Sequence, residues 1–152
     1  MINSIKRLTN IQKHQLVNLI KLYFKEIEDE ILDTEATSIY ITNVEKSLKK
    51  YQSLHLLVFK DKGEINGFLL GNINYKYRDE ECSFILELYV SKEYRLQGIG
   101  KALVREFERL SNNNIYLTSN KDAEKFYTSI GFKTDNSIDN DNGNKIFKKT
   151  RN

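Results

Sequence analysis

Two glycines separated by one residue, placed between a run of β-forming residues and a helical pattern, constrain the fold of this chain most. Residues 86–90 (Leu-Glu-Leu-Tyr-Val) are typical of a buried strand, whereas Gly98 and Gly100 open a segment with helical hydrophobic spacing. The first turn of a helix has N–H groups without intrahelical acceptors, and the helix dipole makes this end electropositive. Because glycine has no Cβ, the backbone here can approach an anion closely. The pattern predicts a strand–loop–helix unit that binds a diphosphate, with Arg95 as an added positive charge.

Other phosphate-binding motifs fit this segment less well. A P-loop has a lysine followed by serine or threonine after its second glycine, but here Lys101 is followed by Ala102. A dinucleotide fingerprint has Gly or Ala three residues after the second glycine and places the glycines at the tip of the strand. Leu103 occupies that position, and a loop separates the strand from the glycines. A plainer interpretation, in which the glycines only shape a turn, stays open at this point.

The hydrophobic pattern along the rest of the chain predicts one domain over residues 1–152, with no proline and no linker-like stretch. Helices are predicted to begin at Thr9, Thr42, Gly98 and Asn120. The predicted strands are residues 2–7, 54–59, 65–75, 82–90, 115–117, 132–134 and 145–149. The last two strands are expected to pair around a polar loop, residues 135–144. The element order is β-α-α-β-β-β-α-β-α-β-β, which indicates a mixed sheet with helices on its faces.

Two capping-box patterns place helix starts in the first third of the chain. Thr9 with Gln12, and Thr42 with Glu45, each combine a capping hydroxyl with a Gln or Glu three residues later. Residues 28–40, between these helices, give no clean hydrophobic period. The predicted inward-facing residues are Leu16, Leu19, Ile20, Tyr23, Phe24 and Ile27 in the first helix, and Val44, Leu48 and Tyr51 in the second.

Composition argues against several classes of protein. The 24 basic and 21 acidic residues leave a net charge of +3, and the lysines are spread over the whole length, so no nucleic-acid partner is expected. No segment approaches the roughly 18 apolar residues that cross a bilayer, and residues 1–7 lack a signal-peptide core. The single cysteine, Cys82, cannot form an internal disulfide. A cytoplasmic protein without a membrane partner is therefore expected.

Two motifs in the second half of the chain resemble those of the GCN5-related N-acetyltransferase (GNAT) superfamily. The glycine segment is similar to that family's acetyl-CoA pyrophosphate loop, and a later segment is similar to its second cofactor motif. The two matches are Arg95-x-x-Gly98-x-Gly100 and Asn120-x-x-Ala123-x-x-Phe126-Tyr127-x-x-x-Gly131-Phe132. The resemblance covers residues 1–149, although the first third matches only in its helix order. Leu96 departs from the family pattern, which often has a glycine there.

This resemblance implies a fold and an activity. The fold would be α+β, with a mixed, mostly antiparallel sheet of about seven strands, four flanking helices and splayed central strands. The activity would be that of an N-acetyltransferase, moving the acetyl group of acetyl-CoA directly onto a small amine or a protein amine. Acetyl-CoA would be a co-substrate, and no metal is indicated. Family members commonly form homodimers, so a homodimer is one expectation.

The resemblance also implies which residues bind the cofactor. In the family the fourth strand splays from the fifth, and the pantetheine arm lies in the gap, bonded to backbone; a β-bulge near Glu87 would produce this splay. The helix start would hold the pyrophosphate, and an amide N–H near the bulge would stabilise the oxyanion. The implied cofactor-binding residues are Leu88, Tyr89, Val90, Arg95, Leu96, Gln97, Gly98, Ile99, Gly100, Lys101, Ala102, Asn120, Ala123, Phe126 and Tyr127.

Tyr127 is the implied catalytic acid, since the family's tyrosine at this place sits beside the sulfur. A thiolate with a pKa near that of cysteine, ~8.5, needs only modest help from an acid as it leaves. The alternative is a core tyrosine with a satisfied hydroxyl, because Tyr127 also belongs to the apolar stripe of its helix.

Glu87 is the candidate base. It interrupts an apolar strand in which strict alternation places residues 84, 86, 88 and 90 on one face and residues 85, 87 and 89 on the other. An acid in a central strand needs an explanation. Glu87 is a base or a ligand of the substrate amine in one interpretation, and a salt-bridge partner or an exposed side chain in the other. A water chain could carry the proton equally well.

Acidic residues crowd the end of the first helix and the segment after it: Glu26, Glu28, Asp29, Glu30, Asp33 and Glu35. In the family this region lines the acceptor pocket, which would suit a cationic amine. A solvated helix end is the alternative. His14, His55 and Cys82 have no metal-ligand spacing and are expected to be structural or on the surface.

A catalytically silent acyl-CoA-binding module is the competing functional class. Tyr127 and Glu87 argue against it, since a protein that only binds needs neither. The sequence leaves open the amine acceptor, the oligomeric state, the general base and the acyl-chain selectivity.

Overall fold

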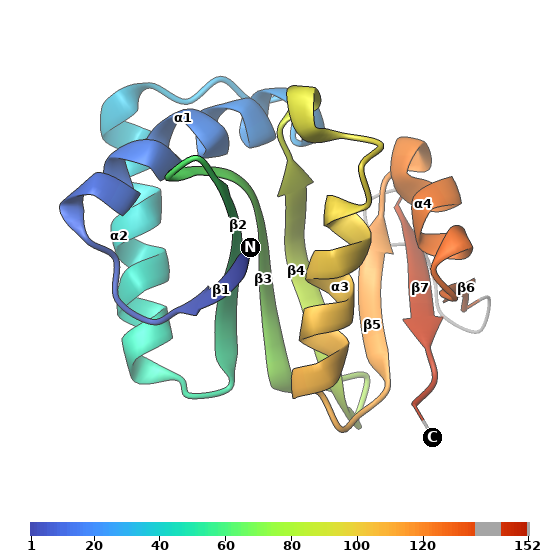
Figure 1. Cartoon of the computed structure of the whole chain (residues 1–152). Helices are drawn as coiled ribbons and strands as arrows, with labels where there is room; N and C mark the ends of the chain where they lie inside the picture. Colours follow the sequence, from blue (N-terminus) through green and yellow to red (C-terminus); the bar gives the residue numbers. More distant parts are fainter. Residues whose placement is uncertain (136–143, 152) are drawn as a thin grey trace.

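A mixed seven-stranded sheet crosses the molecule, with helices on both of its faces (Figure 1). The computed structural model describes residues 1–135 and 144–151. The strands are β1 (Ile2–Ile5), β2 (Leu54–Asp61), β3 (Glu64–Tyr77), β4 (Glu80–Val90), β5 (Ile115–Ser119), β6 (Lys133–Thr134) and β7 (Lys145–Lys149). In the described residues the α-helices are α1 (Asn10–Ile27), α2 (Thr34–Lys50), α3 (Ile99–Leu110) and α4 (Glu124–Ser129), with 3-10 turns η1 (Lys92–Tyr94) and η2 (Lys121–Ala123).

The sheet has the order β1-β2-β3-β4-β5-β7-β6. Only the β4–β5 pair is parallel among the paired strands of the described chain. The predicted α+β class, with a mostly antiparallel sheet and four helices, is therefore confirmed. The predicted pairing of the last two strands is also confirmed, but residues 136–143 of the loop between them lie outside the described residues.

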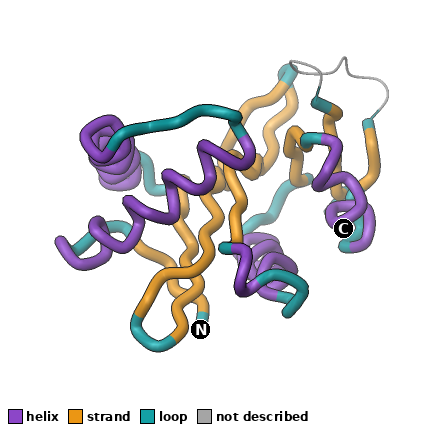
Figure 2. The backbone as a smooth tube through the Cα atoms, turned by 90° about the horizontal axis from the view of Figure 1, so that it is seen from above, coloured by secondary structure: helices purple, strands orange, loops and turns teal. Residues whose placement is uncertain are grey.

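Helices α1 and α2 cover one face of the sheet, and α3 and α4 cover the other, as the view from above shows (Figure 2). On the first face, Leu16 and Tyr23 of α1 and Leu48 of α2 are buried in one apolar cluster with the sheet. On the second face, Phe107 of α3 and Tyr127 of α4 belong to a separate cluster. In residues 1–135 and 144–151, no helix is both long and apolar enough to cross a bilayer.

The start of α1 is as predicted. The Thr9 hydroxyl accepts a hydrogen bond from the Gln12 N–H at 3.1 Å, and the Gln12 side chain accepts one from the Thr9 N–H at 2.9 Å. Both members of the capping box are therefore present. The end of the helix differs slightly, because Ile27, predicted to face inward, is 39% exposed.

The predicted start of α2 is wrong. The helix begins at Thr34, because the Asp33 carboxylate caps it by accepting from the Ala36 N–H at 2.7 Å. Glu45 is therefore no capping residue but lies in the helix interior, where it accepts from the Leu8 N–H at 2.8 Å. Tyr51, predicted to face inward, follows the helix and is half exposed.

Several boundaries in the second half also differ from prediction. Strands β3 and β4 run further than expected and meet at a tight turn of Arg78 and Asp79, whose φ angles of 49° and 67° suit a hairpin turn with both central residues left-handed. The helix predicted from Asn120 is divided into η2 and a short α4.

A β-bulge in β4 lies beside Glu87. Leu70 of β3 is opposite Glu87, while the next residue, Gly71, is opposite Ile85, so Leu86 is the extra residue. The bulge predicted near Glu87 is present. It also makes the predicted strict alternation wrong, because one extra residue reverses which face each later side chain occupies. Ile85 accordingly packs on the α3 and α4 face with Leu88.

Strands β4 and β5 diverge beyond the bulge (Figure 1). They pair only from Ser83 to Ile85 on β4 and from Ile115 to Leu117 on β5, although β4 continues to Val90. The last part of β4 therefore pairs with β3 but not with β5. This is the splay of central strands that the fold prediction contained.

Candidate functional site

The divergence of β4 and β5 opens toward the start of α3, where the glycine segment lies. Gly98 is the N-cap residue of α3 with a φ of 81°, and no side chain caps this end of the helix. The first-turn N–H groups are therefore left for another acceptor. A Cβ added to Gly98 would meet no atom within 4 Å, so its backbone conformation, and not crowding, requires glycine here. This open space beside uncapped amides fits an anionic group.

Gly100 is required for a different reason. A Cβ at this position would meet the ring of Phe126 at 3.1 Å and 3.4 Å. The glycine therefore lets α3 pack closely against the segment that contains the second predicted motif. The contact between Gly100 and Phe126 brings the glycine segment together with the second predicted motif, residues 120–132.

Leu96 precedes the helix in a strained conformation. Its φ is 62°, in the left-handed region, and its side chain is fully exposed. A left-handed conformation costs a non-glycine residue about 1–2 kcal/mol. Leu96 therefore adopts a backbone conformation that favours glycine, the residue that the family pattern often has here.

We expect Leu96→Gly to stabilise the protein by up to about 1 kcal/mol, since the strain removed exceeds the roughly 0.4–1 kcal/mol entropy cost of glycine. Urea unfolding would measure this change. Leu96→Ala is the control, because it removes the exposed side chain but keeps the strain. Equal stability of the two variants would contradict the strained-loop interpretation.

Arg95 lies beside the loop but is engaged by protein groups. Its guanidinium pairs with Glu26 at 2.5 Å, its Nε donates to the Val90 carbonyl at 2.9 Å, and it lies over the ring of Tyr89. Tyr89 in turn donates to Glu26 at 2.7 Å, and burial together with this carboxylate raises the pKa of Tyr89 to about 12. Arg95 therefore links the loop to the end of α1 through its ion pair with Glu26, which partly neutralises its positive charge.

The remaining loop residues predicted to bind the cofactor through their backbone lie at the start of α3. Ile99 buries its side chain in the core, whereas Lys101 and Ala102 are exposed. Gln97 is exposed, and its side-chain amide donates to the Glu93 carbonyl at 3.3 Å.

Asn120 directly follows the end of β5. Its Oδ1 accepts from the Ala123 N–H at 3.0 Å and so caps η2. This bond fixes the orientation of the amide, and among the described residues its Nδ2 donates to no partner. A donor held in this way can bind a carbonyl of a bound ligand.

Tyr127 is buried in an aromatic cluster. Its side chain is only 7% exposed, and its ring lies 5.1 Å from that of Phe126, 5.8 Å from that of Phe132 and 6.3 Å from that of Phe147. Burial raises the pKa of the Tyr127 phenol well above its usual range. The phenol is therefore protonated at neutral pH.

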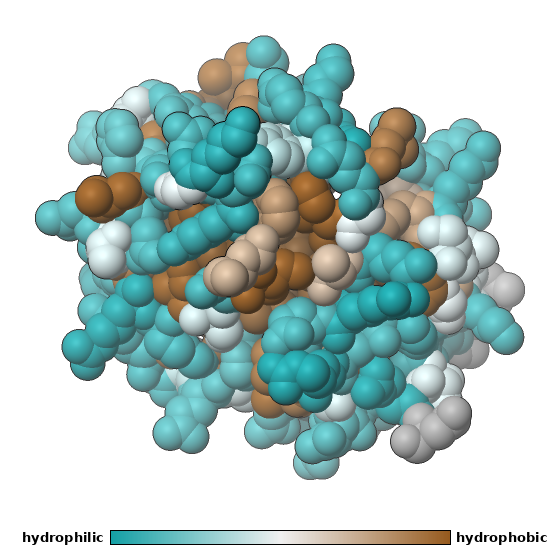
Figure 3. Space-filling model, viewed as in Figure 1, coloured by the Kyte–Doolittle hydropathy of each residue, from teal (hydrophilic) through white to brown (hydrophobic). Residues whose placement is uncertain are grey.

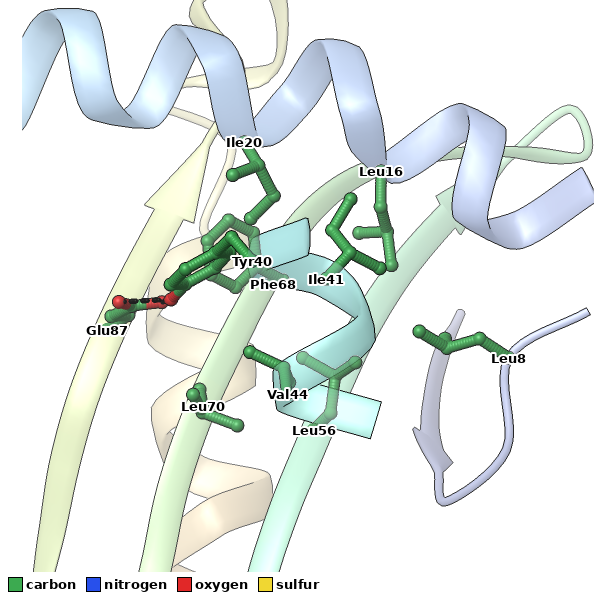
Figure 4. Close-up of a pocket in the computed structure, with 10 residues that line it drawn as sticks. All are labelled: Leu8, Leu16, Ile20, Tyr40, Ile41, Val44, Leu56, Phe68, Leu70 and Glu87. Atoms are coloured by element: carbon green, nitrogen blue, oxygen red, sulfur yellow. Dashed lines mark hydrogen bonds between the residues drawn. The ribbon is translucent and has the colours of Figure 1, made fainter. Parts of the chain in front are cut away.

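Glu87 lies on the α1 and α2 face, where it is paired with a tyrosine that sequence reasoning missed. The Tyr40 hydroxyl donates to both carboxylate oxygens of Glu87 at 2.5 Å (Figure 4). The pKa of Glu87 is raised by burial and by the nearby carboxylate of Glu28, while the bond from Tyr40 lowers it. The predicted salt-bridge alternative is wrong, since the partner is a phenol.

The Glu87–Tyr40 pair borders a small apolar pocket between α1, α2 and the sheet (Figure 4). Its volume is ≈ 20 Å³, which is enough for a water molecule. The other lining residues are all apolar: Leu8, Leu16, Ile20, Ile41, Val44, Leu56, Phe68 and Leu70.

Tyr23 of α1 interacts with the acidic residues Glu28 and Glu87. Its hydroxyl donates to Glu28 at 3.2 Å. Its pKa is raised first by burial, then by the charges of Glu87 and Glu28, and also by the Tyr127 phenol. The two candidate catalytic residues lie on opposite faces of the sheet, Tyr127 with α3 and α4 and Glu87 with α2.

Sequence reasoning placed Tyr23 only in the core and assigned Tyr40 to a segment without a period. A signal for Tyr40 existed. Asp33 is a preferred N-cap residue, and a helix begun there places Tyr40 and Val44 on one face.

The acidic cluster divides into two parts. Glu26 and Glu28 contact tyrosines of the site, and Asp33 caps α2. The others are solvated and exposed: Asp29, Glu30 and Glu35. Cys82 is buried, and this burial raises the pKa of its thiol to about 11, as expected for a structural cysteine.

Comparisons with known proteins agree with this geometry. Residues 14–132 match the model of the Acetyltransferase (GNAT) family. A search of curated proteins found no match. Among solved structures, the PaiA N-acetyltransferase from Thermoplasma acidophilum in complex with coenzyme A is 21% identical, with a TM-score of 0.73 and 99% of each chain covered.

Two further structures share the fold. An aminoglycoside 6'-N-acetyltransferase complexed with coenzyme A is 18% identical, with a TM-score of 0.73, covering 99% of this chain and 96% of that one. A ribosomal-protein-alanine N-acetyltransferase from Brucella melitensis is 14% identical, with a TM-score of 0.66 and 99% of each chain covered. Since the family model spans most of the sequence, this chain belongs to the Acetyltransferase (GNAT) family.

Proposed function

We propose that this protein is an acetyl-CoA-dependent N-acetyltransferase that moves an acetyl group directly onto an amine. The observation that carries the proposal is the end of β4, which pairs with β3 but not with β5 and lies beside the uncapped start of α3. Strand edges offer backbone hydrogen bonds to an extended arm, and helix starts bind phosphates. Coenzyme A has both groups, a pantetheine arm and a pyrophosphate.

Each binding group of the chain has a role in this proposal. The backbone of Leu88, Tyr89 and Val90 would bind the pantetheine arm, together with Nδ2 of Asn120. The first-turn amides of α3, from Gly98 onward, would bind the pyrophosphate. Arg95 would hold the loop in place through Glu26, and it would add positive charge near the phosphates.

The proposed proton transfers use the two faces of the site. The thioester of acetyl-CoA supplies an electrophilic carbonyl carbon. Glu87 would bind the substrate ammonium and accept its proton, directly or through a water molecule, while Tyr40 holds the carboxylate in position. Tyr127 would donate its phenolic proton to the departing thiolate. Burial raises the pKa of Glu87, and this makes its carboxylate a stronger base.

The electrostatics of the site favour a cationic acceptor. Glu28 and Glu87 raise the pKa of Tyr23 through their negative charge, so both carboxylates act on one region. A primary amine with a pKa near ~10 arrives protonated and would be attracted to them. The structural relatives act on different amines by their names, an aminoglycoside and a ribosomal protein.

Free-thiol release from acetyl-CoA, measured with a panel of polyamines, aminoglycosides and lysine peptides, tests this proposal. Amine-dependent release is expected. Tight binding of acetyl-CoA without release for any amine would support the competing class, a silent acyl-CoA-binding module.

We expect Glu87→Gln to stabilise the protein at neutral pH while lowering turnover. A carboxyl whose pKa is raised on folding binds its proton more tightly in the folded state, so its stabilising contribution is lost as pH rises through that pKa. The amide carries no such charge and still accepts from Tyr40. Thermal unfolding should show a gain in Tm for the variant that is larger at about pH 8 than at about pH 4. Parallel Tm profiles for the two proteins would contradict the buried-carboxylate assignment.

A further inference from the structure

A polar groove runs between α3 and the end of α4, on the face of the sheet that includes the glycine segment. Its volume is ≈ 300 Å³. The lining residues are Lys101, Val104, Arg105, Glu108, Ser129, Ile130, Gly131 and Lys149. Of the residues assigned above to the candidate site, only Lys101 lines this groove. Its role in that site is carried by its backbone N–H, so its side chain has no role there.

Part of the charge in this groove is neutralised. Glu108 pairs with Lys149 at 2.9 Å and with Arg151 at 3.3 Å. Lys149 also donates to the Ile130 carbonyl at 2.9 Å. Glu108, the acidic residue of the groove, therefore forms ion pairs with Lys149 and Arg151 and with no other cation of the described residues.

Two cations of the groove have no such partner. Lys101 and Arg105 are exposed, and neither makes an ion pair or a side-chain hydrogen bond with any residue in the described ranges 1–135 and 144–151. They are four residues apart on α3, so they lie one above the other on the same side of the helix, where like charges repel. Lys101 and Arg105 therefore place two positive charges without ion-pair partners along the groove, and this arrangement favours binding of a dianion between them.

The position of this pair relative to the glycine segment limits what the anion can be. Lys101 is in the first turn of α3, directly after Gly98 and Gly100, and Arg105 follows about 6 Å further along the axis. In coenzyme A the ribose that bears the pyrophosphate also bears a 3′-phosphate. A coenzyme whose pyrophosphate is bound at the helix start therefore carries a second phosphate, on the same ribose, that can reach this pair.

We propose that Lys101 and Arg105 bind the 3′-phosphate of the coenzyme in the α3–α4 groove. This inference rests on the proposed function. A phosphate monoester carries close to two negative charges at neutral pH, and the arginine fork matches its oxygens. The groove thus selects coenzyme A over its dephosphorylated precursor.

Calorimetric titration with coenzyme A and with 3′-dephospho-coenzyme A tests the proposal. Wild-type protein is expected to bind coenzyme A at least about tenfold more tightly, and the difference should shrink with added salt. Arg105→Ala and Lys101→Ala should each reduce the preference severalfold, and the double variant should abolish it. Arg105→Ala should leave binding of the dephosphorylated form unchanged. Arg109→Ala is the matched control, because Arg109 lies one turn further along α3, pairs with Glu106 and does not line the groove; it should keep the full preference.

The outcomes separate the two proposals. Equal affinity of the wild-type protein for both coenzymes would overturn the groove assignment and leave the acetyltransferase proposal standing. Binding of neither coenzyme would overturn the proposed function itself. Inorganic phosphate is the probe for a free anion: if it raises Tm through Arg105 while the two coenzymes bind equally, the groove binds free phosphate and the 3′-phosphate assignment is wrong.

Discussion

Replacing Gly98 with valine is expected to weaken acetyl-CoA binding about a hundredfold. The φ of 81° at Gly98 suits glycine and excludes a β-branched residue, so the loop must change shape and its amides must turn away from the phosphates. The loss of one or two charge-assisted hydrogen bonds, worth about 1.5–3 kcal/mol each, gives an effect of this size. Calorimetry would measure it.

Gly63→Val is the matched control for this variant. Gly63 has a φ of 78°, and a Cβ there would also meet nothing within 4 Å, but it lies in the β2–β3 turn. Both variants should lose similar stability, whereas only the Gly98 variant should lose affinity. Unchanged affinity in Gly98→Val, or equal losses of affinity in the two variants, would show that the loop conformation is not what binds the coenzyme.

Removal of the Tyr127 hydroxyl is expected to reduce kcat by about a hundredfold, with little change in acetyl-CoA affinity. Phenylalanine fills the same space in the aromatic cluster, so the fold should be kept, while the proton donor for the thiolate is lost. Steady-state kinetics of Tyr127→Phe would measure the change. An acyl donor with a more acidic thiol should restore much of the rate, because such a leaving group needs no acid.

Tyr116→Phe provides the comparison for this prediction. Tyr116 is also a buried tyrosine, but it belongs to a different apolar cluster, with Cys82 and Ile146. Turnover should be unaffected there. If Tyr127→Phe retained full turnover, or if its deficit did not depend on the leaving group, Tyr127 would be a core residue and nothing more.

The conformation of the proposed cofactor half of the site could be predicted from the sequence because its determinants are local. Gly98 and Gly100 indicate a backbone conformation and a close contact that favour glycine. Asn120 is a capping residue whose hydrogen-bond partner, Ala123, is only three residues away in the sequence. The reason for Gly100, its contact with Phe126, could not be read from the sequence, since those residues meet only in the folded protein.

The acceptor half could be predicted less well. Tyr40 reaches Glu87 across 47 positions of sequence. The sequence predicts a helix start at Thr42, because the capping box of Thr42 with Glu45 is a stronger pattern than Asp33 alone, whereas the helix begins at Thr34. The bulge at Leu86 reversed the faces of β4, which no periodicity within a single strand reveals. Arg95 was correctly placed beside the loop, but its partner Glu26 comes from the end of α1, a distant element.

The most direct measurement is an amide NMR titration of the purified protein with acetyl-CoA. If the start of α3 binds the pyrophosphate, the amide signals of Gly98, Ile99 and Gly100 will shift strongly and saturate together, while that of Gly63 stays in place. Saturable binding that leaves the three signals unchanged, or no binding at all, would contradict this assignment.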